Sequence, residues 1–249
     1  MKVALLFSGQ PRYVYSSAYL TIKSQLLDKY DCDVFVHCWW DGDTTEKMVA
    51  SPWSHTPQGF APNGQELRHI QELYQPKRFI TSPSLPRDSV PSYPRTHYPI
   101  VSYNLTSMYT SMKRVWEQCQ DYEQQTNQTY DVYMRIRFDD ILVRVPDLST
   151  LPPSSIFFID HTPDRPVLTN HFVMSTSREA MDRLMNVVSQ LQWLADHTTI
   201  YINDEEIIGY VFLLASDKLP DVNVVKLPMA VCKCELPQEH KGWVPLLRD

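Results

Sequence analysis

Glycine is scarce in this sequence, with 6 residues in 249 against 19 prolines. The glycines stand at positions 9, 42, 59, 64, 209 and 242, and nowhere do they form G-x-G-x-x-G. That fingerprint needs its glycines for a tight turn and for close backbone approach to a pyrophosphate, so the usual Rossmann dinucleotide site is excluded. Gly59 and Gly64 have the outer spacing of a P-loop, but Gln65 and Glu66 follow where Lys and Ser or Thr must stand. Ordinary P-loop ATPase chemistry is therefore excluded as well.

Basic runs, paired cysteines and long apolar runs are also missing. The formal net charge is -6 and no dense Lys/Arg face is visible, which argues against a nucleic-acid partner. The five cysteines have no paired C-x-x-C spacing, so free thiols are expected at positions 32, 38, 119, 232 and 234. The apolar run at 3–7 is too short for a signal peptide or a membrane span. We expect a cytoplasmic protein without a membrane span, in the host cytoplasm if the chain is viral.

Short apolar runs alternate with segments of helical periodicity along the chain. Strands are predicted at 2–7, 33–40, 77–81, 130–139, 155–160 and 222–227. Helices are predicted at 17–30, 65–74 and 104–122, from the capping box Thr176-x-x-Glu179 to Leu191, and from Asn203-x-x-Glu206 onward. This alternation predicts an α/β fold with a mostly parallel sheet flanked by helices and with long loop insertions. No linker divides the chain, so a single domain over 1–249 is expected; the tail after Pro228 reads as irregular.

Four of the predicted strands end in polar or charged residues, at 8–12, 37–41, 135–140 and 160–161. In parallel α/β sheets, ligands bind beyond the carboxyl ends of the strands. We therefore expect these four groups to meet at one rim of the sheet.

The segment Arg135-Ile-Arg-Phe-Asp-Asp140 is the most informative one. On a strand, Arg135, Arg137 and Asp139 alternate and would share one face, where buried charges are costly unless paired or bound to a ligand. Arginine forks suit phosphate, and aspartate suits Mg²⁺ or Mn²⁺. The segment predicts a site for a metal-bound diphosphate; an internal Arg–Asp ion-pair network without a ligand remains open.

Four short motifs follow one another in a fixed order: Ser8-Gly-Gln-x-Arg12, Val-Phe-Val-His-Cys-Trp-Trp40, Asn104-Leu-x-Ser-Met-Tyr109 and Arg-x-Arg-x-Asp139. In this order the chain resembles, from residue 1 to about 215, the nucleotide-sugar-dependent glycosyltransferases of GT-A type found in bacterial and large-virus glycan synthesis. The resemblance implies a single Rossmann-like GT-A domain without the glycine fingerprint. It implies a nucleotide-binding half at about 1–140 and an acceptor half at about 141–249.

The resemblance also assigns expected roles to individual residues. The residues expected to contact the nucleotide sugar are Ser8, Gly9, Gln10, Arg12, His37, Trp39, Tyr103, Arg135 and Arg137. Asp139 corresponds to the metal-binding end of the family's Asp-x-Asp signature, whose first Asp is replaced here by Arg137. Asp140 is expected to share the ligand role, with His240 as a further metal or phosphate ligand. The implied Mn²⁺ or Mg²⁺ would neutralise a diphosphate leaving group.

A transferase that inverts the anomeric centre also needs a carboxylate to take the proton of the acceptor hydroxyl. Asp204, Glu205 and Glu206 open a predicted helix, and Glu205 best matches the family's glutamate before an apolar helix. Acidic residues in a first turn also interact favourably with the helix dipole, so a purely structural role stays open.

The sequence thus predicts a glycosyltransferase, of hexosyl- or deoxyhexosyltransferase type, that moves a sugar from a nucleoside-diphosphate sugar to a carbohydrate acceptor, with UDP favoured. One alternative is a metal-dependent phosphohydrolase or nucleotidyltransferase using Asp139, Asp140 and Asp160. The other is a non-catalytic nucleotide- or carbohydrate-binding module.

Overall fold

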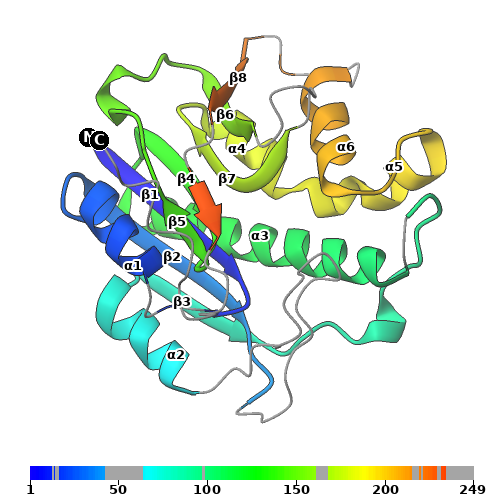
Figure 1. Ribbon diagram of the computed structural model, residues 1–249, viewed down its shortest axis with the longest axis horizontal. Helices are drawn as coiled ribbons and strands as arrows, with labels where there is room; N and C mark the ends of the chain where they lie inside the picture. The colour runs from blue at the N-terminus through cyan, green and yellow to red at the C-terminus, as the bar shows by residue number, and fades with distance from the viewer. Residues whose placement is uncertain are drawn as a thin grey trace, which may run out of the picture.

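The molecule is built on a seven-stranded sheet between two layers of helices (Figure 1). The computed structural model describes residues 1–12, 14, 17–42, 64–96, 99–160, 168–214, 219, 221–228 and 231–233. Across the sheet the strand order is β3-β2-β1-β4-β7-β6-β8. The strands are β1 (Lys2–Gly9), β2 (Asp31–Trp39), β3 (Arg78–Ser82), β4 (Val132–Ile136), β6 (Ser155–Asp160), β7 (Thr169–Ser175) and β8 (Asn223–Pro228). Within the described sheet only β7 runs antiparallel to its neighbours, which confirms the predicted mostly parallel α/β fold.

Helices cover both faces of the sheet. On one face lie α1 (Ser17–Ile22), which continues as a π-helical turn over Lys23–Leu27, and α2 (Gly64–His69), which continues over Ile70–Tyr74. On the other face lie α3 (Pro99–Thr126), α4 (Arg178–Met185), α5 (Leu191–His197) and α6 (Asp204–Gly209), the last continuing over Tyr210–Leu214. Short 3-10 turns occupy Arg87–Ser89, Leu148–Thr150 and Val187–Gln190. None of the described helices is both long and apolar enough to cross a membrane.

The two faces have separate apolar cores, and β1 contributes to both. Ala4 and Leu6 belong to the core under α3, whereas Val3, Leu5 and Phe7 belong to the core under α1 and α2. A strand covered on both faces is apolar throughout rather than alternating, which explains the continuous apolar run near the N-terminus.

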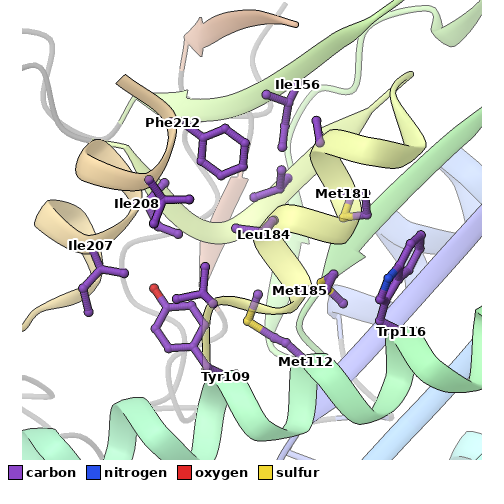
Figure 2. Close-up of a cluster of buried hydrophobic side chains, with 14 of the residues drawn as sticks. Tyr109, Met112, Trp116, Ile156, Met181, Leu184, Met185, Ile207, Ile208 and Phe212 are labelled. Atoms are coloured by element: carbon purple, nitrogen blue, oxygen red, sulfur yellow. The ribbon is translucent and has the colours of Figure 1, made fainter. Parts of the chain in front are cut away.

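The larger core joins α3 to the C-terminal helices (Figure 2). The apolar stripe of α3, which the three- and four-residue spacing predicted, faces α4 and α6. The main contributors to this core are Tyr109, Met112 and Trp116 on α3, Met181, Leu184 and Met185 on α4, and Ile207, Ile208 and Phe212 on α6 and the turn that follows it. This packing holds α3 across the middle of the sheet.

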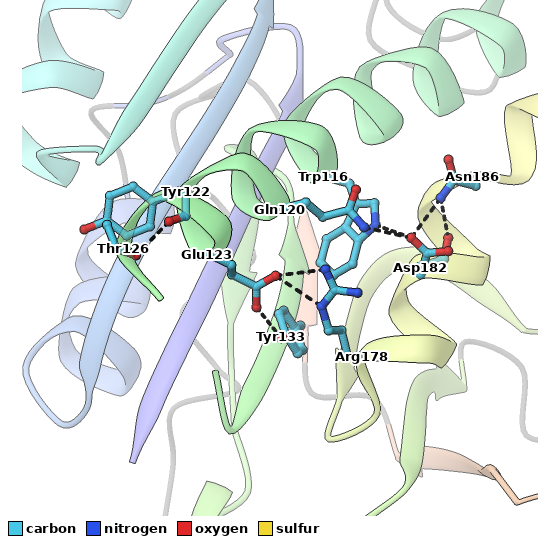
Figure 3. A network of polar contacts seen from close by, with 9 residues as sticks. All are labelled: Trp116, Gln120, Tyr122, Glu123, Thr126, Tyr133, Arg178, Asp182 and Asn186. Atoms are coloured by element: carbon cyan, nitrogen blue, oxygen red, sulfur yellow. Dashed lines mark hydrogen bonds and ion pairs between the residues drawn. The ribbon is translucent and has the colours of Figure 1, made fainter. Parts of the chain in front are cut away.

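Polar contacts also connect α3 to α4 and β4 (Figure 3). The Trp116 indole N–H donates to Asp182 Oδ1 at 2.6 Å, and the Tyr133 hydroxyl donates to Glu123 Oε1 at 2.6 Å. Arg178 Nη2 lies 3.1 Å from the other oxygen of Glu123. Because each of these carboxylates has hydrogen-bond donors, burial beside the core does not leave it unsatisfied.

One correction bears directly on the candidate site. β4 ends at Ile136, so Arg137 and Asp139 lie beyond the strand, and the expectation that they share a strand face with Arg135 is wrong. The Arg137 amide donates to Asp140 Oδ2 at 2.9 Å, and the Asp140 amide donates back to the Arg137 carbonyl at 3.3 Å. These two bonds close a turn, which ends the alternation of an extended strand.

Other differences concern element boundaries. The N-cap of α4 is Ser177, whose Oγ accepts from the Ala180 amide at 3.1 Å, and not Thr176, whose hydroxyl donates to the Pro152 carbonyl. The Asn203 cap of α6 is confirmed, since its Oδ1 accepts from the Glu206 amide at 2.9 Å.

Three strands, β5 (Asp140–Leu142), β7 and β9 (Val231–Lys233), were not predicted from the sequence. β9 pairs with β5 in a region predicted to be irregular. The described thiols at positions 32, 38 and 119 are free, as expected.

Candidate functional site

The strand order places a topological switch point between β1 and β4. From β1 the chain moves to β2 and β3 on one side, then returns through α3 to β4 on the other side. In such sheets the loops at the carboxyl ends diverge at this point and leave a crevice in which ligands bind. The register pairs Phe7 with Ile136, so the segments 8–12 and 137–140 both begin at this edge. The predicted rim therefore includes the two segments richest in candidate residues.

Three charged side chains meet across the switch point. Arg137 Nε donates to Asp139 Oδ1 and its Nη2 to Asp139 Oδ2, both at 2.7 Å. Arg12 Nη2 lies 4.0 Å from Asp139 Oδ2. The structure thus brings together Arg12 from the β1 end with Arg137 and Asp139 from the β4 end. Asp139 pairs with Arg137 and lies within ion-pair distance of Arg12, which is the Arg–Asp arrangement that the sequence left open.

Among the described residues, only one of the two carboxylate oxygens of Asp140 has a hydrogen-bond partner. Its side chain is 0% exposed, and although Oδ2 accepts the Arg137 amide, Oδ1 has no hydrogen-bond partner within the described part of the chain. Burial raises the pKa of Asp140, and the charge of Asp139 raises it further, while Arg137 and Arg135 oppose the rise. A buried carboxylate oxygen is costly to leave unsatisfied, so this atom marks a place for a cation or a donor group.

Arg135 is 1% exposed on the sheet face covered by α3. Its register neighbours are Leu6 on β1 and Val173 on β7. Its charge lowers the pKa of Asp140, so Arg135 acts on the same site from within the sheet.

Ser8 and Gly9 end β1 at the same edge. Ser8 is 5% exposed, and its Oγ has no hydrogen-bond partner among the described residues. Gly9 adopts φ +114°, a conformation that side-chain-bearing residues rarely adopt, although a Cβ there would meet no heavy atom within 4 Å. Gly9 is therefore required by the turn and not by close packing. The Gln10 carbonyl accepts from the Arg12 amide at 2.9 Å, which tightens the same turn.

His37 lies beside Ser8 in the register of β1 and β2 but is buried and engaged within the protein. Its Nδ1 is 2.7 Å from Ser111 Oγ, and its Nε2 is 3.1 Å from Ser82 Oγ and 3.4 Å from Arg114 Nη1. Burial, with a smaller contribution from Arg114, lowers the pKa of His37 to about 3. A neutral imidazole with both nitrogens engaged positions its neighbours; direct contact between His37 and a nucleotide stays a prediction.

The titration of His37 predicts how stability depends on pH. The pKa of His37 in the folded protein is about 3, below the ordinary value of 6.5, so the unfolded chain binds more protons between these values. We expect the free energy of unfolding to fall as pH drops from about 6.5 toward 3, with His37 contributing up to about 1.4 kcal/mol per pH unit. Urea unfolding of the wild type and His37→Gln across this range measures the difference in slope. Equal slopes would contradict the assignment.

Trp39 and Tyr103, the aromatic residues predicted to contact the nucleotide sugar, are both hydrogen-bonded within the protein. The Trp39 indole N–H donates to the Ser107 carbonyl at 3.2 Å, and the Arg114 guanidinium lies 4.9 Å from the Trp39 ring centroid. The half-buried Tyr103 donates its hydroxyl proton to the Leu85 carbonyl at 2.9 Å. Both rings lie near the start of α3, but their contact with a sugar or base stays a prediction.

Arg114 is the residue of this region that the sequence analysis missed. It lies on α3 in a stripe of polar residues at 107, 111, 114 and 118, which keeps the three- and four-residue spacing of one helix face. That stripe, beside the apolar stripe already recognised, is the signal that could have found it.

The candidate acids lie at the start of α6. Glu206 Oε2 accepts from the Tyr201 amide at 2.8 Å, so this carboxylate serves the local turn. The side chains of Asp204 and Glu205, and the whole of His240, fall outside the part of the chain that the structure describes. No group of three or more His, Cys, Asp or Glu residues suited to a metal ion occurs among the described residues.

Comparisons with known proteins give likeness to solved structures but none to families or curated sequences. No family model matches the chain, and no curated protein matches its sequence. Among solved structures, one similar chain is a "glycosyltransferase involved in the glycosylation of the major capsid of PBCV-1". The two share 8% sequence identity at a TM-score of 0.42, over 92% of this chain and 82% of that one.

Proposed function

We propose that this protein is a glycosyltransferase that moves a sugar from a nucleoside-diphosphate sugar, with UDP favoured, to a carbohydrate acceptor. The observation that carries the proposal is the charged cluster at the β1/β4 switch point. There Arg12, Arg137 and Asp139 meet beside Asp140, whose buried Oδ1 has no partner among the described residues.

The arginines supply the charge that a diphosphate requires. Arg12 and Arg137 flank Asp139, and Arg135 acts on Asp140 from the sheet. Guanidinium forks bind phosphate oxygens with paired hydrogen bonds. On binding, the diphosphate would accept hydrogen bonds that Arg137 now donates to Asp139.

The free oxygen of Asp140 fits a divalent cation, and Asp139 fits one when Arg137 turns to phosphate. Two protein carboxylates with phosphate and water oxygens form an ordinary Mg²⁺ or Mn²⁺ donor set, and His240 is proposed as a further ligand. When bound, the cation would neutralise charge that develops on the leaving diphosphate. The chain's own arginines would stabilise the same charge, which lowers the barrier because negative charge develops on the diphosphate as the glycosidic bond breaks.

Glu205 is proposed as the general base. In an inverting transfer its carboxylate takes the proton of the acceptor hydroxyl as the oxygen bonds to the sugar's anomeric carbon, and the diphosphate leaves with the electrons of the broken C–O bond. The position of Glu205 in the first turn of α6 suits a structural role equally well, and the variant described next separates the two roles.

Glu205→Gln is expected to slow transfer at least about a hundredfold while donor affinity stays the same, because the amide cannot accept the proton. Transfer is measured by product formation and donor binding by calorimetry. Glu179→Gln, which removes an exposed acid from the first turn of α4, is the matched control for loss of the dipole interaction alone. Retained transfer by Glu205→Gln would move the base role elsewhere.

The reaction class is tested by incubating the full chain with UDP-, GDP- and dTDP-sugars and Mn²⁺ and identifying the products. Release of nucleoside diphosphate with free or transferred sugar is the expected result. Release of inorganic phosphate, or of nucleoside monophosphate with sugar phosphate, would contradict the proposal and favour a metal-dependent phosphohydrolase.

A further inference from the structure

Arg114 is a cation held in one place by neighbours that do not neutralise it. Its guanidinium lies 4.9 Å from the Trp39 ring centroid, and its Nη1 lies 3.4 Å from His37 Nε2. Within the described part of the chain no carboxylate comes within ion-pair distance of it. Arginines that are half-buried ordinarily pair with an acid, because desolvating a lone charge is costly.

Neither neighbour carries a compensating charge. His37 is neutral at physiological pH, since burial and the charge of Arg114 itself hold its pKa near 3. The face of Trp39 attracts the guanidinium through the ring quadrupole, which orients the cation without neutralising it. The His37–Trp39 pair therefore works as a scaffold that fixes the direction of Arg114.

The position of Arg114 relates it to the candidate site. Its partner His37 is in register with Ser8. Neighbouring strands lie about 4.8 Å apart. Arg114 thus reaches the sheet one strand away from the switch point, on the face that also carries Arg135.

Two hydroxyls on the elements around Arg114 lack partners among the described residues: Ser8 is in register with His37, and Ser107 is on α3. Ser8 Oγ and Ser107 Oγ are inaccessible to water and have no hydrogen-bond partner among the described residues. Ser107 lies two helical turns before Arg114 in the same polar stripe of α3. A cation with unused hydroxyls on the neighbouring strand and on its own helix is the kind of donor set that a phosphate group uses, because phosphate oxygens accept from both.

We infer that Arg114 binds a phosphate group of the donor's diphosphate, with Ser8 beside it. This inference rests on the proposed function, because it names a further residue of the same nucleotide site. Arg114 approaches from α3, whereas Arg12 and Arg137 approach from the loops after β1 and β4, so the diphosphate is held from separate directions.

The test compares binding of uridine, UMP and UDP to the full chain by calorimetry. Arg114→Met removes the charge but keeps an apolar stem over Trp39, and Arg114→Lys keeps the charge without the fork. Because a charge-assisted hydrogen bond is lost, Arg114→Met is expected to weaken UDP binding about tenfold or more and uridine binding less than about twofold, with Arg114→Lys between. The matched control is Arg78→Met, since Arg78 also stacks on an aromatic ring of α3, Tyr122, at 5.3 Å.

The binding of UDP and of uridine to the variants decides whether Arg114 contacts phosphate. A loss of UDP affinity without a matching loss for uridine supports phosphate contact by Arg114. Equal losses for UDP and uridine, or unchanged UDP affinity in a folded variant, overturn it. If the wild type binds no nucleotide, the proposed function fails instead, and inorganic pyrophosphate then tests Arg114 alone: binding to the wild type but not to Arg114→Met supports the anion site, and equal binding overturns it.

Discussion

Replacing Asp139 with Asn is expected to lower the rate of sugar transfer by about a hundredfold to a thousandfold. Both oxygens of Asp139 hold the Arg137 fork, and Arg12 lies 4.0 Å from one of them. The amide keeps the shape but loses the charge that orients these arginines, and it is a poor ligand for a divalent cation. Initial rates with the preferred donor, over a range of Mn²⁺ concentrations, measure the loss.

The control must separate lost chemistry from lost folding, because an unpaired arginine in a partly buried site also destabilises the protein. Circular dichroism and urea unfolding establish that Asp139→Asn is folded under assay conditions. Asp139→Glu, which restores the charge, is expected to recover part of the activity. The matched control is Asp28→Asn, which removes an exposed carboxylate that bonds to Lys23. Asp28 precedes β2 and lies at the opposite edge of the sheet. Wild-type rates from a folded Asp139→Asn protein would contradict the site assignment.

Replacing Trp116 with Ala is expected to lower the free energy of unfolding by about 3–5 kcal/mol, the usual cost of truncating a large buried aromatic residue. Trp116 is 0% exposed and packs edge-on against Tyr133 with centroids 5.3 Å apart. Truncation leaves a cavity between α3 and α4 and also removes one of the donors to Asp182 (Figure 3). Urea unfolding with comparison of midpoints and m-values measures the effect.

Two further variants distinguish the sources of this stability. Trp116→Phe keeps a ring but loses the indole N–H, so its cost is expected to fall well below that of Trp116→Ala. Trp193→Ala removes a tryptophan that is 50% exposed on α5, and is expected to change stability by less than about 0.5 kcal/mol. A loss from Trp116→Ala no larger than that from Trp193→Ala would contradict the packing described for α3.

Sequence patterns predicted the secondary structure correctly where burial of apolar side chains decided the conformation. β6 has the predicted bounds, Ser155–Asp160, because an apolar run buried on both faces has few other stable conformations. The long periodic stripe predicted α3, although the helix extends from Pro99 to Thr126, beyond the predicted 104–122. Helix ends depend on capping and tertiary contacts that periodicity does not contain.

Local patterns failed where tertiary pairing decided the conformation. Thr169-Asn-His-Phe-Val-Met-Ser175 has neither a continuous apolar run nor a clean alternation, yet it forms β7 because β4 and β6 pair with it on either side. β4 ends early for a different reason. Asp140 bonds to the Arg137 amide, and this contact between a side chain and the backbone competes with continued extension.

The candidate site was predicted in part. Parallel strands that each end in polar residues indicated the rim, and Arg12, Arg137 and Asp139 do meet there. Arg114 was missed because its place in the site depends on His37 and Trp39, which lie about 75 residues away in the sequence. Contacts of that range follow from the packing of α3 on β2, which no single segment encodes.

The central claim, that the switch point binds a nucleoside-diphosphate sugar, is tested most directly by thermal unfolding of the full chain with UDP-, GDP- and dTDP-sugars, each with and without Mn²⁺. A ligand that binds only the folded state stabilises it by about 2.7 kcal/mol at a hundred times its Kd. The account predicts that one nucleotide class raises the Tm by several degrees, and that the rise is lost in Asp139→Asn. No rise with any of these donors, in the presence or absence of Mn²⁺, would contradict it.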